Sequence, residues 1–248
     1  MKARALVVLF LLACAASFAA DPDIELILRT IDRQTSFRDV DFSALLSVIH
    51  EDPEDGVDKS VVQQFRRDGQ DKFVMLFLEP AVKKGQGYLR VDDNLWFYDP
   101  ESRKFSHTSM KEQFGGTEAK NSDFGVSRLA EDYDLLSLAE DNLGPHPVYV
   151  LDLRAKSDEV TYSRRLVWVT RDRYLVLKSQ DYSETGRLLR TSLYPSYARV
   201  GGRYVPSKLI FIDELVQGRK TSLSLSQVSL APLPDSVFTK AYLERVNR

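Results

Sequence analysis

Residues 95–98 (Leu-Trp-Phe-Tyr) place the strongest constraint on the fold of this chain, because all four are apolar. Turn-forming residues stand on either side, Asp-Asp-Asn at 92–94 and Asp-Pro at 99–100, so the segment is predicted to be a short strand. Neighbouring side chains of a strand point to opposite faces of a sheet. An antiparallel sheet with one face in water alternates polar and apolar residues. Something must therefore cover both faces of this strand.

More segments are apolar at every position, namely residues 73–78, 166–169, 174–177 and 209–212. Uninterrupted apolar strands are usual in parallel sheets, where crossover helices cover both faces. In this chain short turns that contain Asp, Asn and Gly separate the strands, which favours antiparallel hairpins. The chain must therefore cover both faces of a large antiparallel sheet with few helices.

The spacing of apolar and turn residues predicts an α+β, mainly β protein of about 11 strands, or twelve, with two or three helices. A helix is expected from Asp21-Pro22 to near Ser36, because Asp caps helices and Pro suits the first turn. A second helix is expected at 127–141, where Leu129, Tyr133 and Leu136 form one stripe, and a short third one at 235–246. The predicted strands are 42–50, 60–67, 73–78, 87–91, 95–98, 104–108, 148–153, 160–169, 174–182, 188–194, 203–213 and 221–230.

Residues 1–19 are predicted to be a secretory signal peptide. Lys2 and Arg4 precede an apolar run at 5–13, and small residues at 17 and 19 suit cleavage before Ala20. An alternative is that residues 11–14 (Leu-Leu-Ala-Cys) act as a lipobox, in which case Cys14 would be lipidated and would anchor the mature protein. Both interpretations make it a secreted protein.

Residues 20–248 are predicted to form a single domain, because no change in composition marks a boundary. The net charge of −2 argues against a nucleic-acid binder. His50, His107 and His146 lack the spacing of metal ligands. The sequence has neither the Gly-x-Ser-x-Gly turn of serine hydrolases nor a phosphate-binding glycine loop. We therefore expect a binding protein without cofactor or metal, not an enzyme.

Two arrangements would bury both faces of the sheet. A sandwich or closed barrel would bury them as ordinary core. An unclosed, strongly curved barrel with a helix as a lid would instead leave an apolar cavity, and an apolar cavity of that kind suits a long apolar guest such as a lipid chain. Which alternate residues face inward depends on the register. The residues predicted to line the cavity are Met75, Phe77, Leu95, Phe97, Trp168 and Phe211.

Several motifs resemble the bacterial outer-membrane lipoprotein-sorting protein family (LolA-like). They are Phe-Leu-Glu-Pro at 77–80, Lys-Gly-x-Gly-x-Leu at 84–89, Asn-Leu-Trp-x-Tyr-x-Pro at 94–100 and Ser-Asp-Phe at 122–124. Residues 238–243 resemble the usual ending of that family. The similarity extends from about residue 21 to residue 248. It implies an unclosed, curved antiparallel barrel with helices as a lid (LolA/LolB-like).

The resemblance also implies a periplasmic carrier. Its cavity would receive the acyl chains of a lipoprotein or lipid and move them between the inner and outer membrane. Relatives work with inner-membrane transporters, so such a transporter is an expected partner, and the carrier is expected to be a monomer. The alternative is an envelope sensor or interaction module of the same fold, accessory to an inner-membrane transporter.

Overall fold

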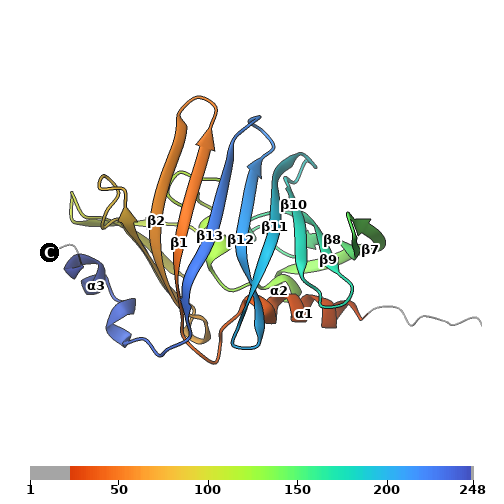
Figure 1. Cartoon of the computed structure of the whole chain (residues 1–248), viewed down its shortest axis with the longest axis horizontal. Helices are drawn as coiled ribbons and strands as arrows, with labels where there is room; N and C mark the ends of the chain where they lie inside the picture. The colour runs from red at the N-terminus through yellow and green to blue at the C-terminus, as the bar shows by residue number, and fades with distance from the viewer. Residues whose placement is uncertain (1–22, 247–248) are drawn as a thin grey trace, which may run out of the picture.

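The structure is a computed structural model, and it describes residues 23–246. The predicted signal peptide, Cys14 and the expected helix cap at Asp21 lie outside these residues. Within them thirteen strands form one antiparallel sheet (Figure 1). The strands are β1 (Phe42–Asp52), β2 (Gly56–Arg67), β3 (Lys72–Glu79), β4 (Gly87–Val91), β5 (Asn94–Asp99), β6 (Lys104–Thr108), β7 (Tyr133–Leu143), β8 (His146–Ala155), β9 (Arg164–Thr170), β10 (Val176–Tyr182), β11 (Leu188–Val200), β12 (Arg203–Asp213) and β13 (Lys220–Ser229).

The strand order is β6-β5-β4-β3-β2-β1-β13-β12-β11-β10-β9-β8-β7. The chain therefore runs by hairpins from the middle of the sheet to the β6 edge, crosses to the β7 edge, and returns by hairpins to pair β13 with β1. Because β6 and β7 do not pair, the curved sheet stays unclosed, and this confirms the predicted fold class. The crossing between these two edge strands brings residues 109–132 over one face of the sheet.

The helices of the described chain are short. They are α1 (Ile24–Thr35), α2 (Leu129–Asp132) and α3 (Lys240–Arg245), together with the 3-10 turns η1 (Asp68–Gln70), η2 (Asn121–Phe124) and η3 (Asp235–Phe238). The carboxylate of Asp23 caps α1 by accepting from the Leu26 N–H at 3.0 Å. None of the described helices has the length and apolar character needed to cross a membrane.

The predicted helix at 127–141 is wrong. Only α2 is helical, and the chain then enters β7, which pairs with β8. Gly144, at φ +59°, and Pro145 join Leu143 to His146 in a tight hairpin rather than ending a helix. The apolar stripe fits a helix locally, but the hydrogen bonds to β8 are available only once the sheet has formed, so tertiary pairing outweighs the local pattern.

Different elements cover the two faces of the sheet. On the inner face, α1 packs on β8 and β9 through Ile27, Leu28 and Ile31, and the crossing segment packs on β2 to β5 through Phe114 and Phe124. On the outer face, η3 and α3 cover β3 to β5 through the side chains of Val237, Phe238 and Leu243.

Residues 95–98 illustrate this double cover. Leu95 and Phe97 face the inner cluster, whereas Trp96 and Tyr98 face the outer one. The Lys240 ammonium of α3 lies 4.2 Å from the centre of the Trp96 ring, which adds a cation–π contact on the outer side. The apolar run is thus explained by one cover on each face.

Candidate functional site

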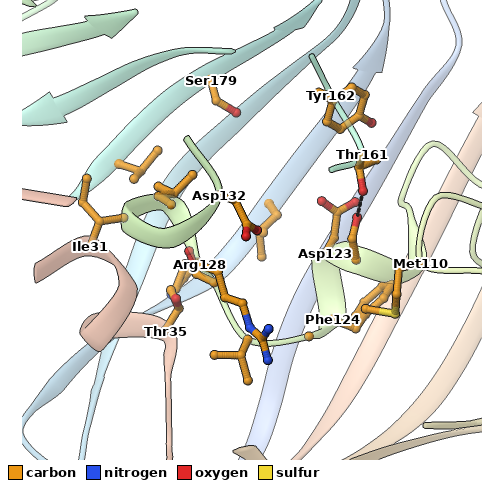
Figure 2. A pocket seen from close by; sticks show the side chains of 18 of the residues that line it. Ile31, Thr35, Met110, Asp123, Phe124, Arg128, Asp132, Thr161, Tyr162 and Ser179 are labelled. Carbon is orange, nitrogen blue, oxygen red and sulfur yellow. Dashed lines mark hydrogen bonds between the residues drawn. The ribbon is translucent and has the colours of Figure 1, made fainter. Parts of the chain in front are cut away.

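A cavity of about 490 Å³ lies on the inner face, between the sheet and the segments that cross it (Figure 2). We call these segments the cover: α1, residues 109–132 and the loop 156–163. Strands β1 and β9 to β13 contribute most of the sheet side of the cavity. Its volume is in the range of about 300–1,000 Å³ that is typical of ligand sites.

One wall of the cavity is apolar. Alternate residues of three adjacent strands face inward because side chains alternate along a strand, and the register brings Leu209 opposite Leu223 and Leu46 opposite Leu225. The apolar side chains that line this wall are Phe42, Leu46, Leu209, Phe211, Leu223 and Leu225. A hydrocarbon chain placed against them would leave water without losing any hydrogen bond.

The neighbouring part of the sheet, on β9 to β11, carries a buried ionic network, and we call it the polar wall. Arg190 donates from Nε to Asp181 at 3.0 Å and from both Nη atoms to Asp123, at 2.6 and 3.0 Å. Arg165 donates from Nε to the other oxygen of Asp181 at 2.7 Å. The guanidinium of Arg190 also lies over the rings of Tyr162 and Phe211, at 4.9 and 4.5 Å. The network contains two cations and two carboxylates, so its charges cancel.

Three hydroxyl groups stand beside this network. Burial raises the pKa of the Tyr162 and Tyr194 phenols, with the charge of Arg190 and that of Arg165, respectively, opposing the shift. Ser179 is buried on β10, directly opposite Val167 of β9 and Ser192 of β11, and its Oγ has no hydrogen-bond partner. All three residues line the cavity.

Hydrogen bonds hold the parts of the cover together. Asp32 of α1 accepts from Ser127 Oγ at 2.6 Å and from the backbone N–H groups of Leu129 and Ala130 at 2.9 and 3.1 Å, so it caps α2 from a neighbouring helix. Thr161 donates to Ser122 at 3.1 Å, as the dashed line in Figure 2 shows. The cover is therefore a connected unit.

The cover is also joined to the sheet. Asp123 of η2 binds Arg190 of β11, and Arg128 donates to Asp71, at the start of β3, at 2.8 Å. Burial raises the pKa of Asp132, which also lines the cavity, against the opposing charge of Arg128. Each of these contacts must adapt if the cover moves to admit a guest.

Not all of the six residues predicted to line the cavity do so. Phe211 lines the cavity. Met75, Phe77 and Leu95 face the same side of the sheet and are buried, but they do not border the cavity because Phe114 and Phe124 of the cover fill the space above them. The rings of Phe77 and Phe114 stack at 5.2 Å. Phe97 packs on the same cluster and borders a shallow depression beside Tyr88.

Trp168 does not line the cavity, and its assignment there is corrected. It pairs across the sheet with Val150 and Lys178, and its ring lies 4.4 Å from the Lys178 ammonium. Its neighbours Val167 and Val169 are the residues of β9 that pack on the inner side. The register of β9 therefore places Trp168 on the outer face.

Sequence reasoning missed the polar wall. Arg165, Ser179 and Tyr194 lie at inward positions of their strands, but polar residues in an alternating strand are ordinarily expected to face water. In β9 the polar Arg165 alternates with the apolar Leu166 and Trp168, so a strand that turns Arg165 inward turns these apolar side chains outward. This alternation was the signal that the sequence offered. Among the described residues, no three His, Cys, Asp or Glu side chains are grouped so that they could hold a metal ion.

Comparisons with known proteins agree with this architecture. A family model described as "-like: Uncharacterized protein" matches residues 69–245. A search of curated proteins gives no match. A solved LolA superfamily protein from Nitrosomonas europaea is similar with 28 % identity and a TM-score of 0.76, covering 88 % of this chain and 98 % of that one.

Two further solved structures share the fold. A putative outer membrane lipoprotein-sorting protein domain from Vibrio parahaemolyticus has 20 % identity and a TM-score of 0.79, covering 89 % of this chain and 98 % of its own. A DUF1329 family protein from Desulfovibrio piger has 21 % identity and a TM-score of 0.78, covering 88 % and 97 %. The chain belongs to the family of the matched model, and, as its sequence motifs predicted, it is similar to a LolA superfamily protein and shares the fold of an outer membrane lipoprotein-sorting protein domain.

Proposed function

We propose that this protein is a periplasmic carrier that binds the acyl chains of a lipoprotein or lipid in the cavity and moves them between the inner and outer membrane. The observation that carries the proposal is the apolar wall of β1, β12 and β13, which encloses a cavity of about 490 Å³ under the cover. Similarity to a LolA superfamily protein over 88 % of the chain supports the same role.

Capture in this role is non-covalent. Each CH₂ group buried against the apolar wall contributes about 0.8 kcal/mol, so even half of a long acyl chain gives substantial binding. Release then requires that the cover opens or that a partner competes for the chain. Opening would break contacts such as those of Asp123 with Arg190 and of Asp32 with α2.

Loading and delivery need a membrane partner on each side. An inner-membrane transporter is the partner we propose for loading, in keeping with the sequence motifs at 77–80 and 94–100. The predicted signal peptide would bring the chain to the periplasm, as a soluble carrier if it is cut before Ala20 or as an anchored one if Cys14 is lipidated.

The proposal is tested by filling the cavity. Leu209 lines the apolar wall, whereas its neighbour Ile210 points to the outer face and is half-buried there. We expect Leu209→Trp to weaken binding of a fluorescent acyl probe at least about tenfold, because the larger side chain displaces two or more CH₂ groups of the probe from the apolar wall. Ile210→Trp, the matched control, keeps the affinity of the parent protein.

Transfer gives an independent readout. The parent protein should carry a labelled diacyl lipid from donor to acceptor vesicles faster than spontaneous exchange, and Leu209→Trp should lose this activity while Ile210→Trp retains it. Native mass spectrometry of the purified protein should show co-purifying acyl species. Equal binding by both variants, with the two proteins folded, would exclude the cavity as the lipid site.

A further inference from the structure

The polar wall of the cavity holds a hydroxyl group for which the protein supplies no partner. Ser179 is 1 % exposed, and its Oγ makes no hydrogen bond with any described residue. Figure 2 shows this oxygen turned toward the other side chains that line the cavity. A buried hydroxyl without a partner destabilises the fold, and such groups are rare in proteins.

Two phenol hydroxyls lie beside this wall, that of Tyr194 on β11 and that of Tyr162 in the loop 156–163 of the cover. Tyr162 and Tyr194 both line the cavity, and neither hydroxyl donates a hydrogen bond to another described residue. Tyr162 contacts the network directly, since the guanidinium of Arg165 lies 5.8 Å from its ring centre. The wall thus offers three O–H donors to whatever occupies the cavity.

The charges of this wall favour an uncharged guest group. Arg165 and Arg190 are balanced by Asp181 and Asp123. Asp132 and Glu159 also line the cavity. The other cations of its lining face carboxylates too: Arg66 binds Asp68, Arg128 binds Asp71, and Arg90 lies 3.9 Å from the same Asp71. Among residues 23–246, every cation that lines the cavity therefore has a carboxylate nearby, and an added negative charge at the hydroxyl groups would face desolvation without compensation.

We propose that the polar wall recognises an ester carbonyl of the acylated guest, which accepts hydrogen bonds from Ser179 and from Tyr194 or Tyr162 while its hydrocarbon chain lies on the apolar wall. An ester oxygen has lone pairs to accept these bonds and has neither a charge nor a donor of its own that would need a partner. This inference rests on the proposed carrier function and names the chemical class of its cargo as ester-linked acyl lipid.

The experiment compares chains that differ at the polar end. Methyl palmitate, palmitate and octadecane, each supplied from cyclodextrin, compete for the protein with a fluorescent acyl probe. We expect methyl palmitate to displace the probe at about one-thirtieth of the concentration that octadecane requires, because two net hydrogen bonds of about 1 kcal/mol each distinguish them. Palmitate should bind no more tightly than the methyl ester at pH 7.

Variants locate the effect. Ser179→Ala should lower the affinity for methyl palmitate about fivefold and leave that for octadecane unchanged, and Ser179→Ala combined with Tyr194→Phe should abolish the difference between the two ligands. Ser192→Ala is the matched control, since Ser192 is the equally buried, unpartnered serine directly opposite Ser179 and does not border the cavity. Its ligand affinities should equal those of the parent.

The stability of the ligand-free variants separates recognition from a structural role. Removing an unpartnered hydroxyl should leave Tm unchanged or raise it in both Ser179→Ala and Ser192→Ala. If no acyl compound displaces the probe and the probe itself does not bind, the proposed function fails. The ester site alone is refuted if the compounds bind but the parent shows no preference for methyl palmitate over octadecane. It is also refuted if the double variant keeps the same preference as the parent.

Discussion

At the scale of single residues, Arg190 decides how the cover meets the sheet. Its side chain is 5 % exposed and spans two carboxylates, one on the sheet and one on the cover. Buried ion pairs of this kind need not stabilise a fold relative to apolar residues, but removal of one member leaves the others buried and uncompensated. Arg190 is therefore expected to be far more sensitive to substitution than the many surface arginines.

We predict that Arg190→Met lowers the free energy of unfolding by about 3–5 kcal/mol, because Asp123 and Asp181 lose their shared cation. Arg29 forms an exposed pair with Glu25, at 64 % and 70 % exposure, so Arg29→Met should change stability by no more than about 0.5 kcal/mol. Urea unfolding of the two variants measures the difference. Similar small losses of unfolding free energy in both variants would mean that the ionic network contributes little to the stability of the fold.

Asp41 gives a prediction about pH. Arg67 donates to its two carboxylate oxygens at 2.9 and 3.0 Å, and these bonds hold the pKa of Asp41 below its ordinary value. A carboxyl whose pKa is lower in the folded state stabilises the fold above its unfolded pKa of about 3.9, and this contribution disappears as pH falls through the folded value.

Asp41→Asn should therefore reduce stability at pH 7, and the difference from the parent should shrink as the pH falls below about 3.9. Urea midpoints of both proteins, measured from pH 7 downward, provide the test. A difference that stays constant across this range would show that Asp41 acts through packing or neutral hydrogen bonds, not through its charge.

At the scale of elements, the C-terminal segment acts only on the outer face. Leu243 of α3 is fully buried against the cluster of Val74, Leu76 and Leu89, while Val246, at the end of the same helix, is 41 % exposed. A β-carbon placed on Gly87 would lie 2.7 Å from Leu243 Cδ2, which shows how closely α3 approaches β4. The helix is thus packed as tightly as a core element.

Leu243→Ala should lower the free energy of unfolding by about 2–5 kcal/mol through the lost side chain and the space it leaves. Val246→Ala, at the residue that follows α3, should change it by no more than about 0.5 kcal/mol. Neither should alter acyl-probe affinity, because the cavity lies on the other face. Chemical unfolding and probe titration test both parts, and weaker probe binding by the folded Leu243→Ala protein would contradict the separation of the two faces.

Sequence patterns predicted most of the elements. The predicted strands 87–91, 104–108 and 203–213 coincide with β4, β6 and β12 residue for residue, because turn residues mark both of their ends. The failure at 127–141 arose where no turn residue separates α2 from β7. The apolar spacing of Leu129, Tyr133 and Leu136 fits a helix, and only the distant partner strand decides otherwise.

The site was less predictable than the fold. An apolar strand reveals that both faces are covered but not by what, so Phe211 and Trp168 look equivalent in sequence although they lie on opposite faces. The position of the cavity depends on where Phe114 and Phe124 of the crossing segment come to rest. Such contacts join residues far apart in the chain, and no local pattern specifies them.

At the scale of the whole molecule, the cavity exists because the sheet does not close. The chain must cross from β6 to β7, and this crossing with α1 forms a cover that hydrogen bonds and ion pairs join to the sheet, such as those of Asp123 with Arg190 and of Glu118 with His50 and Thr221. In the proposed carrier the apolar wall would hold a chain with the cover open or shut, so the cover would set the rate of exchange. Its internal connections should then control how fast a guest enters and leaves.

Asp32 is the main such connection, since it accepts three hydrogen bonds that join α1 to residues 127–130. We predict that Asp32→Ala releases a bound acyl probe about tenfold faster, because loss of a helix cap weakens the closed cover by about 0.5–2 kcal/mol. Asp23→Ala, which removes the exposed cap of α1 alone, should leave the release rate unchanged. Stopped-flow release into excess vesicles measures the rates.

Hydrogen exchange distinguishes opening of the cover from general loosening. In Asp32→Ala, amides of α1 and of residues 127–133 should exchange faster, while those of β1, β12 and β13 keep their protection, because the sheet does not depend on this cap. Binding of an acyl chain should restore protection in the cover, since a guest that contacts both the sheet and the cover favours the closed arrangement. If Asp32→Ala releases the probe at the parent rate while α1 exchanges faster, guests pass through another part of the cover. That part would lie between η2 and the loop 156–163, and a variant that removes the hydrogen bond of Thr161 to Ser122 would test it.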